Sequence, residues 1–512
     1  MNRNQIGWML GALTFVLHGA VMSRYGYQTD ELYFIDCAKH LAWGFVDQPP
    51  LAPFFVWLSA PFDYALWAVR FWPSLAAALA VVVSCRVALE MGGGRIAQAV
   101  TGLAVALSPV DLGFGYGLTT SSLEPLTWTL VALFTMRLIR TRDTRWYFAI
   151  AAVAVVGLYM KYTISLELAA LAGAVLLTRD RRLLRSWNAL YAALLVILAT
   201  APNWIWQVQH GLPIIDVMHT DQQRRFQMQN GLRLESPDPF LNGLYFIFAQ
   251  FFYTGPGTWV LWVTGIVAFF RNAKLAPYRA LGIAYILMFV ALILLAGRGY
   301  YICGYYPVLI AAGAVTIVDA VRSASWRYAV AAATLALSLP MLPLSLPVLS
   351  VNSVIAYGWY LGIGRATPDK LPHLIAPQFA LEFGWRDFAA EVSALWKELP
   401  AAQRAHTSIY ADAYGFAGAL NHFGPRYGLP RVISANNNYY LWGYGDWDGK
   451  SLLAVGATQH DLMQKYFKNV KLLATFWDEY RWVEEGPLPV YLCTGPRASR
   501  DEIWRGLRRF GV

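Results

Sequence analysis

Two short acidic segments hold the residues that are best suited to chemistry. The first is DELY at residues 30–33, in which Asp30 and Glu31 are adjacent, and the second is DQPPL at residues 47–51. Carboxylates of this kind can simply be solvated, and that alternative stays open for each acid. The adjacent pair, however, lies between two apolar segments, where a carboxylate that loses its water demands a partner. A partly buried carboxylate there could act as a general base on a hydroxyl group.

The composition of the chain is typical of a membrane protein. Of its 512 residues, 57% are hydrophobic and only 14% are charged, and the mean hydropathy is +0.40. Such values are rare in a protein whose whole surface faces water. The net charge is +10, but the basic residues occur in short clusters between apolar segments, as expected where they set membrane topology. We therefore expect membrane lipids, and no nucleic acid, as partners.

The first apolar run, residues 6–22, follows Arg3 and could be a signal peptide. It lacks a small-residue cleavage site and more long apolar runs follow it, so we interpret it as the first transmembrane helix. The cysteines show no metal-ligand spacing and imply no disulfide framework. They are Cys37, Cys85, Cys303 and Cys493.

Apolar runs of roughly 17 to 25 residues, long enough to cross a bilayer, recur along the first two thirds of the chain. We predict about eleven transmembrane helices, centred near residues 14, 78, 104, 130, 152, 170, 195, 263, 287, 312 and 337. The loops on the N-terminal side of this set are rich in arginine, and the alternate loops are rich in acids. By the positive-inside rule, the N-terminus is cytoplasmic and the acidic loops face the periplasm. The chain is thus predicted to be a multi-pass protein of a bacterial inner membrane.

Two segments on the predicted outer side are too long and too mixed in polarity to be simple connections. They are residues 24–65 and 207–240. Long loops in compact proteins are usually functional or disordered. In the first segment, apolar residues recur at helical spacing over residues 32–42, and rings such as that of Trp43 are typical of a membrane interface. We predict one or two interfacial helices on the outer face of the membrane.

The composition changes after Ser350 to that of a soluble domain. Strand-like runs alternate there with helical stretches such as 386–398 and 458–467, which is typical of an α/β domain. The predicted strands cover residues 407–411, 431–434, 452–455, 470–475 and 489–493. The chain is therefore predicted to have a transmembrane domain, residues 1–349, and a periplasmic α/β domain, residues 350–512.

Five features follow one another in a definite order along the membrane part, about residues 5–345. They are an acidic pair, an acidic-x-Pro-Pro-Leu motif, an acidic-Pro pair, a lysine and a tyrosine-rich stretch, at Asp30-Glu31, Asp47–Leu51, Glu124-Pro125, Lys161 and Tyr300–Pro307. The order of these five features, and the side of the membrane on which they are predicted to lie, resemble those of the large membrane glycosyltransferases with the GT-C fold. The resemblance is in particular to bacterial relatives of protein mannosyltransferases, aminoarabinose transferases and galacturonosyltransferases (families 39 and 83). The resemblance implies a sugar donor that is carried on polyprenyl phosphate.

The resemblance also implies roles for single residues. Asp30 matches the family's catalytic aspartate, the base that deprotonates the acceptor hydroxyl while polyprenyl phosphate leaves, and Glu31 would support it. The reaction would be an inverting displacement at the anomeric carbon without a covalent intermediate. Two family cations are missing, because Gln48 stands where aminoarabinose transferases have a lysine and Tyr33 where they have an arginine. These two residues and Asp47 would then line the donor site.

A phosphate leaving group must still be neutralised, because its charge develops in a low-dielectric setting. Lys161, Arg298 and Arg70 fall at or near predicted outer helix ends, and Tyr301 adds a hydroxyl donor. We predict that these residues, together with Glu124 of the acidic-Pro pair, bind the donor. The alternative is that the cations reach toward lipid headgroups. The glycines on both sides of Arg298 would let the backbone approach a ligand.

No cofactor is implied, with a divalent metal ion as the one open question. Aminoarabinose transferases pair an acid of the Pro-Pro motif with a histidine of a later loop, and the similar pair here is Asp47 and His219. Two ligands fall short of a complete coordination sphere. A histidine in a polar loop can also be simply solvated.

A further motif, NNNYYLWG at residues 436–443, directly follows a predicted strand. Side-chain amides next to aromatic rings commonly bind sugars. The alternative is a turn between a strand and a helix whose aromatic rings lie in the interior. Related motifs assign no role to this segment, so both interpretations stay open.

The function predicted from these features is glycosyl transfer on the periplasmic face. The acceptor stays open among lipid A or the lipopolysaccharide core, another glycan, a lipid and a protein. A secondary transporter is the alternative, but transporters commonly show paired repeats and ionisable groups at mid-membrane, whereas here these groups cluster at outer helix ends. A non-enzymatic membrane scaffold is a third possibility. Only the enzyme requires a carboxylate at Asp30.

Overall fold

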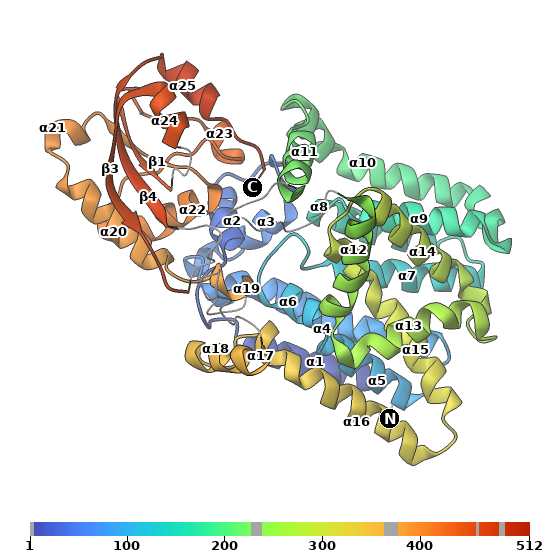
Figure 1. Cartoon of the computed structure of the whole chain (residues 1–512). Coiled ribbons are helices and arrows are strands. Elements are labelled where there is room, and N and C mark those ends of the chain that lie inside the picture. The colour runs from blue at the N-terminus through green and yellow to red at the C-terminus, as the bar shows by residue number, and fades with distance from the viewer. Residues whose placement is uncertain (1–4, 227–237, 363–376, 457–459, 481–486, 512) are drawn as a thin grey trace. The chain divides into compact units, whose positions relative to one another are not determined.

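The computed structural model describes residues 5–226, 238–362, 377–456, 460–480 and 487–511. Residues 227–237 of the predicted outer loop 207–240 therefore lie outside the described residues. The chain is mostly helical and divides into two compact units (Figure 1). The first unit comprises Met1–Ser23, Trp67–Trp204 and Glu235–Val348, and the second comprises Arg24–Leu66, Ile205–Leu234 and Leu349–Val512.

The first unit is built from helices only, within its described residues. Its longer helices are α1 (Gln5–Gly19), α4 (Leu66–Glu90), α5 (Arg95–Ala106), α6 (Pro109–Tyr116), α7 (Glu124–Thr141), α8 (Trp146–Met160), α9 (Ile164–Leu176), α10 (Trp187–Gln209), α12 (Pro239–Thr254), α13 (Pro256–Arg271), α14 (Arg279–Leu294), α15 (Tyr306–Ala320) and α16 (Ala324–Ser338). Its shorter helices are η2 (Arg179–Arg185), η3 (Ala276–Tyr278), η4 (Gly299–Tyr305), η5 (Leu339–Met341) and α17 (Leu342–Ser345). Helix α10 continues from the first unit into the second.

Several helices of the first unit are long and apolar enough to cross a membrane, so the chain is a multi-pass membrane protein. Among the described residues there are five, which cover Leu66–Glu90, Trp187–Gln209, Ala276–Leu294, Gly299–Ala320 and Ala324–Ser345. A sixth is present if α5 and α6, which meet at an angle of 60°, form one span. The bend falls at Pro109, which cannot continue a helix that begins before it. The predicted number of about eleven spans is not confirmed.

The predicted centres nevertheless mark helices. Each of the eleven lies inside one, but α1, α5, α8, α9 and α13 have only 12 to 16 residues. A span needs roughly 17 to 25 residues, so these helices fall short by length. The prediction also missed α12, whose start lies in the predicted outer loop. Hydropathy therefore located the apolar helices but not their ends.

Helix α10 presents apolar side chains outward within its unit. Trp187, Ile197 and Leu198 are 70%, 62% and 71% exposed. A water-soluble protein rarely exposes so large an apolar surface on one helix. Hydrocarbon is the solvent that suits this surface, in agreement with a membrane span.

Close packing of α13 against α15 depends on glycine. A Cβ on Gly265 would lie 2.0 Å from the backbone oxygen of Leu309, and a Cβ on Gly313 would lie 1.8 Å from that of Leu261. Small residues allow such close approach of helix backbones in membrane proteins. The two glycines therefore fix α15 in the centre of the unit, where its segment 306–315 is buried.

The second unit combines helices with one sheet. Its elements are α2 (Thr29–Lys39), α3 (Leu51–Trp57), η1 (Ala60–Phe62), α11 (Pro213–Phe226), α18 (Val351–Tyr360), α19 (Pro377–Ala380), α20 (Trp385–Glu398), α21 (Ala401–Arg404), β1 (Thr407–Ala411), α22 (Tyr414–Phe423), η6 (Gly424–Tyr427), α23 (Asn438–Trp442), β2 (Ser451–Val455), α24 (His460–Tyr466), β3 (Phe467–Phe476), β4 (Leu488–Pro496) and α25 (Arg500–Leu507). This unit thus joins Arg24–Leu66, which contains the predicted outer loop 24–65 of the membrane domain, with the chain from residue 349 onward.

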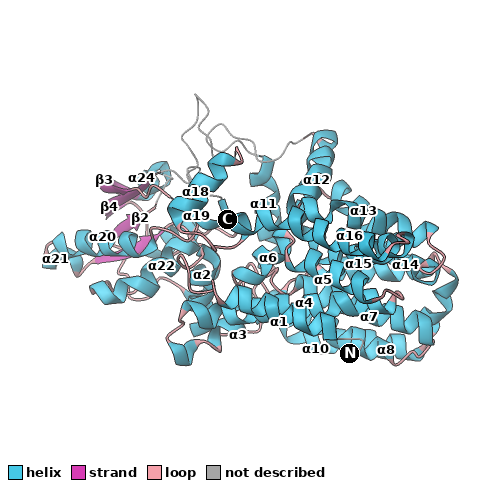
Figure 2. Ribbon diagram, turned by 90° about the horizontal axis from the view of Figure 1, so that it is seen from below, coloured by secondary structure: helices cyan, strands magenta, loops and turns pink. Residues whose placement is uncertain are grey.

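The sheet has the strand order β1-β2-β4-β3. Strands β1 and β2 are parallel, whereas β4 pairs antiparallel with both β2 and β3. Figure 2 shows these strands, in magenta, gathered in this single sheet. Four of the five predicted strand segments are strands, and the fifth, residues 431–434, contributes only an isolated bridge between Ile433 and Tyr410. All five residues of β2 are buried, as expected for a strand inside a sheet that is covered on both faces.

Candidate functional site

The acidic pair lies in the first turn of α2 in the second unit. Gln28 caps the helix, because its side chain accepts a hydrogen bond from the backbone N–H of Asp30 at 3.2 Å. In return, Oε2 of Glu31 accepts from the backbone N–H of Gln28 at 2.9 Å. This reciprocal capping box fixes the residue at which the helix begins, and acids in a first turn are favoured by the helix dipole. Glu31 is buried and holds the helix start, whereas Asp30 is partly exposed.

Two glycines on α22 bring that helix against α2. A Cβ on Gly415 would lie 2.1 Å from Cγ2 of Thr29, and a Cβ on Gly418 would lie 2.8 Å from the carbonyl carbon of Leu32. Any larger residue would push the helices apart. The close approach lets the Tyr414 hydroxyl donate a hydrogen bond to Oδ1 of Asp30 at 2.8 Å.

Asp47 of the Pro-Pro motif lies in the same part of the unit. The Tyr33 hydroxyl donates to its Oδ1 at 3.0 Å, and Nδ2 of Asn437 donates to its Oδ2 at 3.1 Å. Burial raises the pKa of the Asp47 carboxyl to about 7; these hydrogen bonds oppose the shift, and the negative charge of Asp30 adds to it. The side chain therefore changes its charge near neutral pH. We call Asp30, Tyr33, Asp47, Tyr414 and Asn437 the carboxylate cluster.

The three asparagines of the NNN motif are buried and hydrogen-bonded inside the unit. Nδ2 of Asn436 donates to the backbone oxygen of Gly511 at 3.0 Å, and Oδ1 of Asn437 accepts from the backbone N–H of the same glycine at 2.8 Å. Oδ1 of Asn438 accepts from the backbone N–H of Val46 at 2.5 Å. The motif thus ties the Asp47 loop and the C-terminal residues together. The asparagines are therefore interior, but of the aromatic rings in the motif only Tyr439 is buried, whereas Tyr440 and Trp442 are partly exposed, so both interpretations stay open.

Gln48 and His219 do not join the carboxylate cluster through any described contact. Gln48 is buried, and its Nε2 lies 3.9 Å from Sγ of Cys37, whereas His219 is exposed on α11. The described residues hold no group of three or more histidine, cysteine or acidic side chains that could bind a metal ion. Each oxygen of Asp47 accepts one hydrogen bond from a neutral donor, Tyr33 or Asn437. The Asp47–His219 metal site stays a prediction.

A second cluster lies in the first unit around Lys161. This lysine caps the end of α8, and its Nζ donates to Oγ of Ser121 at 2.6 Å and lies 3.6 Å from Oε2 of Glu124. The same ammonium group lies 4.8 Å from the ring centre of Tyr300 and 4.7 Å from that of Tyr301. Cation–π contacts and an ion pair together hold a largely desolvated lysine. We call these five residues the lysine cluster.

Glu124 is placed by the start of α7. It is the first residue of the helix and is followed by Pro125, which is favoured at such a position because it needs no hydrogen-bond partner for a backbone N–H. Glu124 is buried and also accepts a hydrogen bond from the Thr163 hydroxyl. The structure thus brings together three predicted donor-binding residues, Glu124, Lys161 and Tyr301. Ser121 and Thr163 were missed, since single hydroxyl residues beside an acid carry no signal in a sequence.

The two arginines that were predicted to bind the donor have different surroundings. Arg70 in α4 is completely buried, and its guanidinium lies 4.3 Å from the ring centre of Tyr116. It therefore does not reach toward lipid headgroups. Arg298 is partly exposed just before η4. A Cβ on Gly297 would lie 2.5 Å from a methyl carbon of Leu292, so that glycine makes room for a neighbouring side chain rather than for a ligand.

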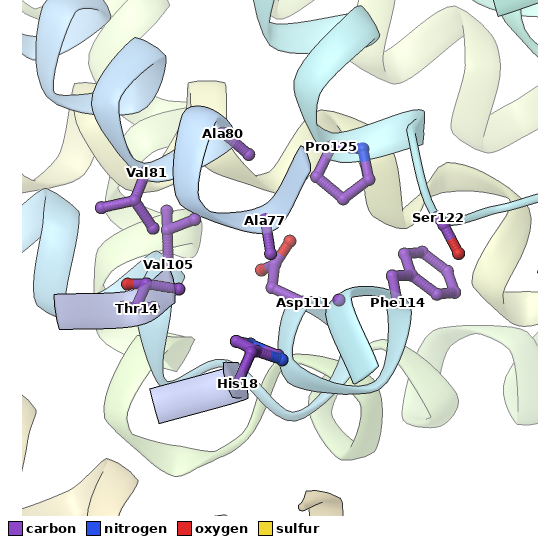
Figure 3. Close-up of a pocket in the computed structure, with 12 residues that line it drawn as sticks. Thr14, His18, Ala77, Ala80, Val81, Val105, Asp111, Phe114, Ser122 and Pro125 are labelled. Carbon is purple, nitrogen blue, oxygen red and sulfur yellow. The ribbon is translucent and has the colours of Figure 1, made fainter. Parts of the chain in front are cut away.

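A small cavity in the first unit combines an acid with a histidine, which resembles a catalytic pair. Figure 3 shows Asp111 of α6 and His18 of α1 lining it together with Thr14 and Ser122. Its volume is about 10 Å³. That space suits one water molecule. The cavity is too small for a sugar or a phosphate, and we do not place the reaction there.

Comparison with known proteins relates the chain to membrane glycosyltransferases. The family described as dolichyl-phosphate-mannose-protein mannosyltransferase matches residues 47–206. This match begins at Asp47 and includes Glu124 and Lys161. No curated protein matches the chain by sequence.

Solved structures extend the likeness over almost the whole chain. The crystal structure of ArnT from Cupriavidus metallidurans bound to undecaprenyl phosphate has a TM-score of 0.59 at 16% identity, and the alignment covers 94% of this chain and 97% of that one. The structure of the same protein in the apo state has a TM-score of 0.57 with the same identity and coverage. The chain thus has the fold of ArnT. The family match and this fold confirm the predicted class, a membrane glycosyltransferase with the GT-C fold.

Proposed function

We propose that the protein transfers a sugar from a polyprenyl-phosphate donor to an envelope acceptor, with inversion at the anomeric carbon. The observation that carries this proposal is the partly exposed carboxylate of Asp30, held by Tyr414 at the start of α2. A base must reach solvent or substrate and yet be oriented by its neighbours. Asp30 meets both conditions, whereas the carboxyl of Glu31 is buried in the helix cap.

In the proposed reaction the acceptor hydroxyl oxygen attacks the anomeric carbon. The bond between this carbon and the phosphate oxygen breaks, and polyprenyl phosphate leaves with the electron pair. The hydroxyl proton passes to the carboxylate of Asp30. The Tyr414 hydroxyl, which donates to Oδ1 of Asp30, orients the carboxylate. One displacement of this kind inverts the configuration and needs no covalent intermediate.

The lysine cluster is the proposed binding site for the donor phosphate. The structural relative ArnT was solved with undecaprenyl phosphate, and a phosphate of this type needs a cation in a poorly solvated setting. Lys161 has a fixed position there, since Glu124, Ser121 and two tyrosine rings surround its ammonium group. Arg70, Arg298 and the hydroxyl of Tyr301 remain further proposed donors to the same ligand.

The proposed location follows from the distribution of charge. Arginine-rich loops on the N-terminal side favour an inner-membrane protein with a cytoplasmic N-terminus. The segment after residue 349 then faces the periplasm, as an α/β domain. Acceptors available on that face are lipid A or the lipopolysaccharide core, other glycans, lipids and proteins.

The test is the variant Asp30→Asn in the purified full-length protein. The substrates are undecaprenyl-phosphate donors that carry a hexose, a uronic acid or an amino pentose, with envelope lipids and glycans from a deletion strain as acceptors. The asparagine keeps the size of the side chain but removes its basicity, so transfer should fall by at least about 100-fold. Asp446→Asn, in an exposed loop of the same unit, is the matched control.

Two outcomes would contradict the proposal. Transfer at a near wild-type rate by the Asp30→Asn variant would remove Asp30 from the mechanism. A wild-type protein that transfers no sugar but moves a solute across proteoliposomes would instead identify a transporter. Unfolding temperatures measured in parallel separate a chemical defect from a loss of structure.

A further inference from the structure

The second unit holds a cavity that is lined by no residue of the carboxylate cluster. Its volume is about 400 Å³, which is within the usual range of small-molecule sites. It lies between the C-terminal end of α2 and the segments that follow α22. The residues that matter here are Asp36, Lys39, His40, Arg431, Tyr439 and Trp442. We call it the Trp442 cavity.

One wall of the Trp442 cavity is aromatic. The rings of His40 and Trp442 are stacked, with centres 4.5 Å apart and planes at 23°, and Tyr439 meets Trp442 edge-on at 4.9 Å. Nδ1 of His40 lies 3.0 Å from the backbone oxygen of Asp36. A carbonyl oxygen can only accept, so this nitrogen carries a hydrogen and the ring orientation is fixed. Trp442 is partly exposed and presents a rigid aromatic surface to a ligand.

The carboxylate of Asp36, which lines the cavity, forms its ion pair and hydrogen bonds with protein groups. Oδ1 of Asp36 pairs with Nζ of Lys39 at 2.9 Å, and its Oδ2 accepts from the Tyr439 hydroxyl at 2.6 Å and from Nδ2 of Asn421 at 2.9 Å. Its side chain is only 6% exposed. The carboxylate therefore organises the cavity but has little capacity left for a ligand.

The accessible charge of the cavity is positive. Lys39 has a side chain that is 38% exposed despite its ion pair. Arg431 is exposed, and no acid among the described residues forms an ion pair with it. Two accessible cations beside one engaged carboxylate leave an excess of positive charge, which favours an anionic ligand.

We propose that the Trp442 cavity binds an anionic sugar, a sugar unit that carries a phosphate or a carboxylate group. The apolar face of a sugar ring would pack on the aromatic wall, because its C–H groups suit the negative face of an aromatic ring. The charged substituent would pair with Arg431 and Lys39. Neither a neutral sugar nor a free anion would use both features.

Within the proposed glycosyl transfer, this sugar belongs to the acceptor. Asp36 follows Asp30 by six residues on the same helix, a rise of about 9 Å along the axis. An oligosaccharide or a glycolipid head group can bridge this distance. Its charged sugar then occupies the Trp442 cavity while a neighbouring hydroxyl reaches Asp30. This role depends on the proposed function, but binding to the cavity does not.

The test measures binding without any donor, by calorimetry on the purified full-length protein in detergent. The probes are galacturonic acid and glucose 1-phosphate, with galactose as the neutral match and inorganic phosphate as the anion alone. Both anionic sugars should bind, and each of the variants Trp442→Ala and Arg431→Gln should weaken their binding by at least tenfold. The controls Trp477→Ala and Lys471→Gln remove an exposed ring and an exposed charge elsewhere in the unit, and they should bind as the wild type does.

Three results with the soluble probes would overturn the proposal. They are equal binding of galactose and galacturonic acid, binding of inorganic phosphate as tight as that of glucose 1-phosphate, and unchanged affinity in both cavity variants. Vesicles that contain anionic phospholipid supply a phosphate without a sugar. If their binding is lost in the Arg431→Gln variant while neither anionic sugar binds, the cavity is a lipid headgroup site and the proposal is wrong.

Failure of this proposal and failure of the proposed function are distinguishable. The variant Asp30→Asn should lose transfer but keep galacturonic acid binding. The variant Trp442→Ala should keep undecaprenyl phosphate binding and raise the KM of the acceptor. A protein that binds the anionic sugars but transfers nothing refutes only the enzymatic function, whereas transfer without such binding refutes only the cavity.

Discussion

The Tyr414 hydroxyl donates a hydrogen bond to Oδ1 of Asp30 at 2.8 Å, although 384 residues separate the two in the chain. The first of the five family motifs therefore obtains a partner from the segment after residue 349. The same is true of Asp47, which accepts a hydrogen bond from Asn437. The C-terminal segment is thus part of the candidate site and not merely an appended domain.

Removal of the Tyr414 hydroxyl should slow the reaction without unfolding the protein. Hydrogen bonds to charged groups contribute about 1.5–3 kcal/mol, and about 1.4 kcal/mol corresponds to a tenfold change in rate. We expect Tyr414→Phe to lower kcat by about tenfold or more with little change in donor binding. The effect should be smaller than that of Asp30→Asn, because the base itself remains.

The matched control is Tyr427→Phe, in η6 of the same unit, which should transfer sugar as the wild type does. Steady-state kinetics of both variants with a fixed donor give the comparison. A Tyr414→Phe variant with wild-type kcat would show that Asp30 needs no orienting partner. A variant that transfers slowly only because its unfolding temperature has dropped would show a structural role instead.

Local motifs predicted part of the site because their residues are neighbours in the chain. Asp30 and Glu31 stand in the first turn of a helix, where acids are favoured, and the capping partner Gln28 is three residues from Glu31. The contact with Tyr414 could not be predicted. It depends on Gly415 and Gly418, which let α22 approach α2, and no pattern within one sequence pairs these distant segments.

The prediction of the membrane helices from the sequence was incomplete for a similar reason. Hydropathy averages over a window, so it placed each predicted centre inside a helix. It did not register the bend at Pro109 between α5 and α6, or the early ends of helices such as α9, which has 13 residues. Backbone geometry ends a helix even where the apolar composition continues. The proximity of Lys161 and Glu124 likewise follows from helix packing and not from their spacing.

Asp47 should make stability depend on pH in a defined direction. The pKa of its carboxyl is raised from 3.8 to about 7 in the folded protein. Between these values the folded state keeps a proton that the unfolded chain has released, so stability falls as the pH rises from about 4 to 7 and this loss is complete above that range. In Asp47→Asn, which does not titrate, this contribution should be absent.

The measurement is the unfolding temperature of the wild type and of Asp47→Asn between pH 5 and pH 8. The difference, variant minus wild type, should increase with pH. Asp446→Asn serves as the control, since its side chain lies in an exposed loop. A difference that stays constant over this range would mean that the Asp47 carboxyl is already ionised at pH 5.

The proposed periplasmic location of the C-terminal segment predicts a labelling pattern. The four native cysteines are buried, so they should react little with maleimide, and the labelling of an introduced cysteine can be measured above a low background. Lys471→Cys places a thiol at an exposed position of β3, and it should react with an impermeant maleimide in whole cells. Ser451, in β2 of the same sheet, is buried and therefore unsuitable for labelling.

Arg182→Cys, at an exposed position of η2 in a predicted cytoplasmic loop, is the opposite control. It should react only after lysis. If Lys471→Cys also reacts only after lysis, the C-terminal segment is cytoplasmic, and the proposed outward-facing active site is wrong. Labelling of both positions in intact cells would show that the cells leak and would require protected membranes.

Variants of Lys161 and Glu124 should show that the stability of the protein and its binding of the carrier phosphate depend on different features of this ion pair. The ion pair is largely desolvated, because Glu124 is buried and the Lys161 side chain is only 15% exposed. The variant Lys161→Met leaves a buried carboxylate without its cation, which costs about 3–5 kcal/mol when such a pair is broken. The double variant Lys161→Met with Glu124→Gln should recover most of that loss, since neither group then carries a charge.

Carrier binding should follow a different pattern from stability. Undecaprenyl phosphate needs the lysine cation but not the glutamate, so Glu124→Gln should keep its affinity, whereas the single lysine variant and the double variant should both lose it. Thermal unfolding and binding of undecaprenyl phosphate, measured on the same four proteins, give both readouts. A double variant that regains stability and keeps full affinity would assign the phosphate to other cations, and Arg70 and Arg298 would then be the next residues to neutralise.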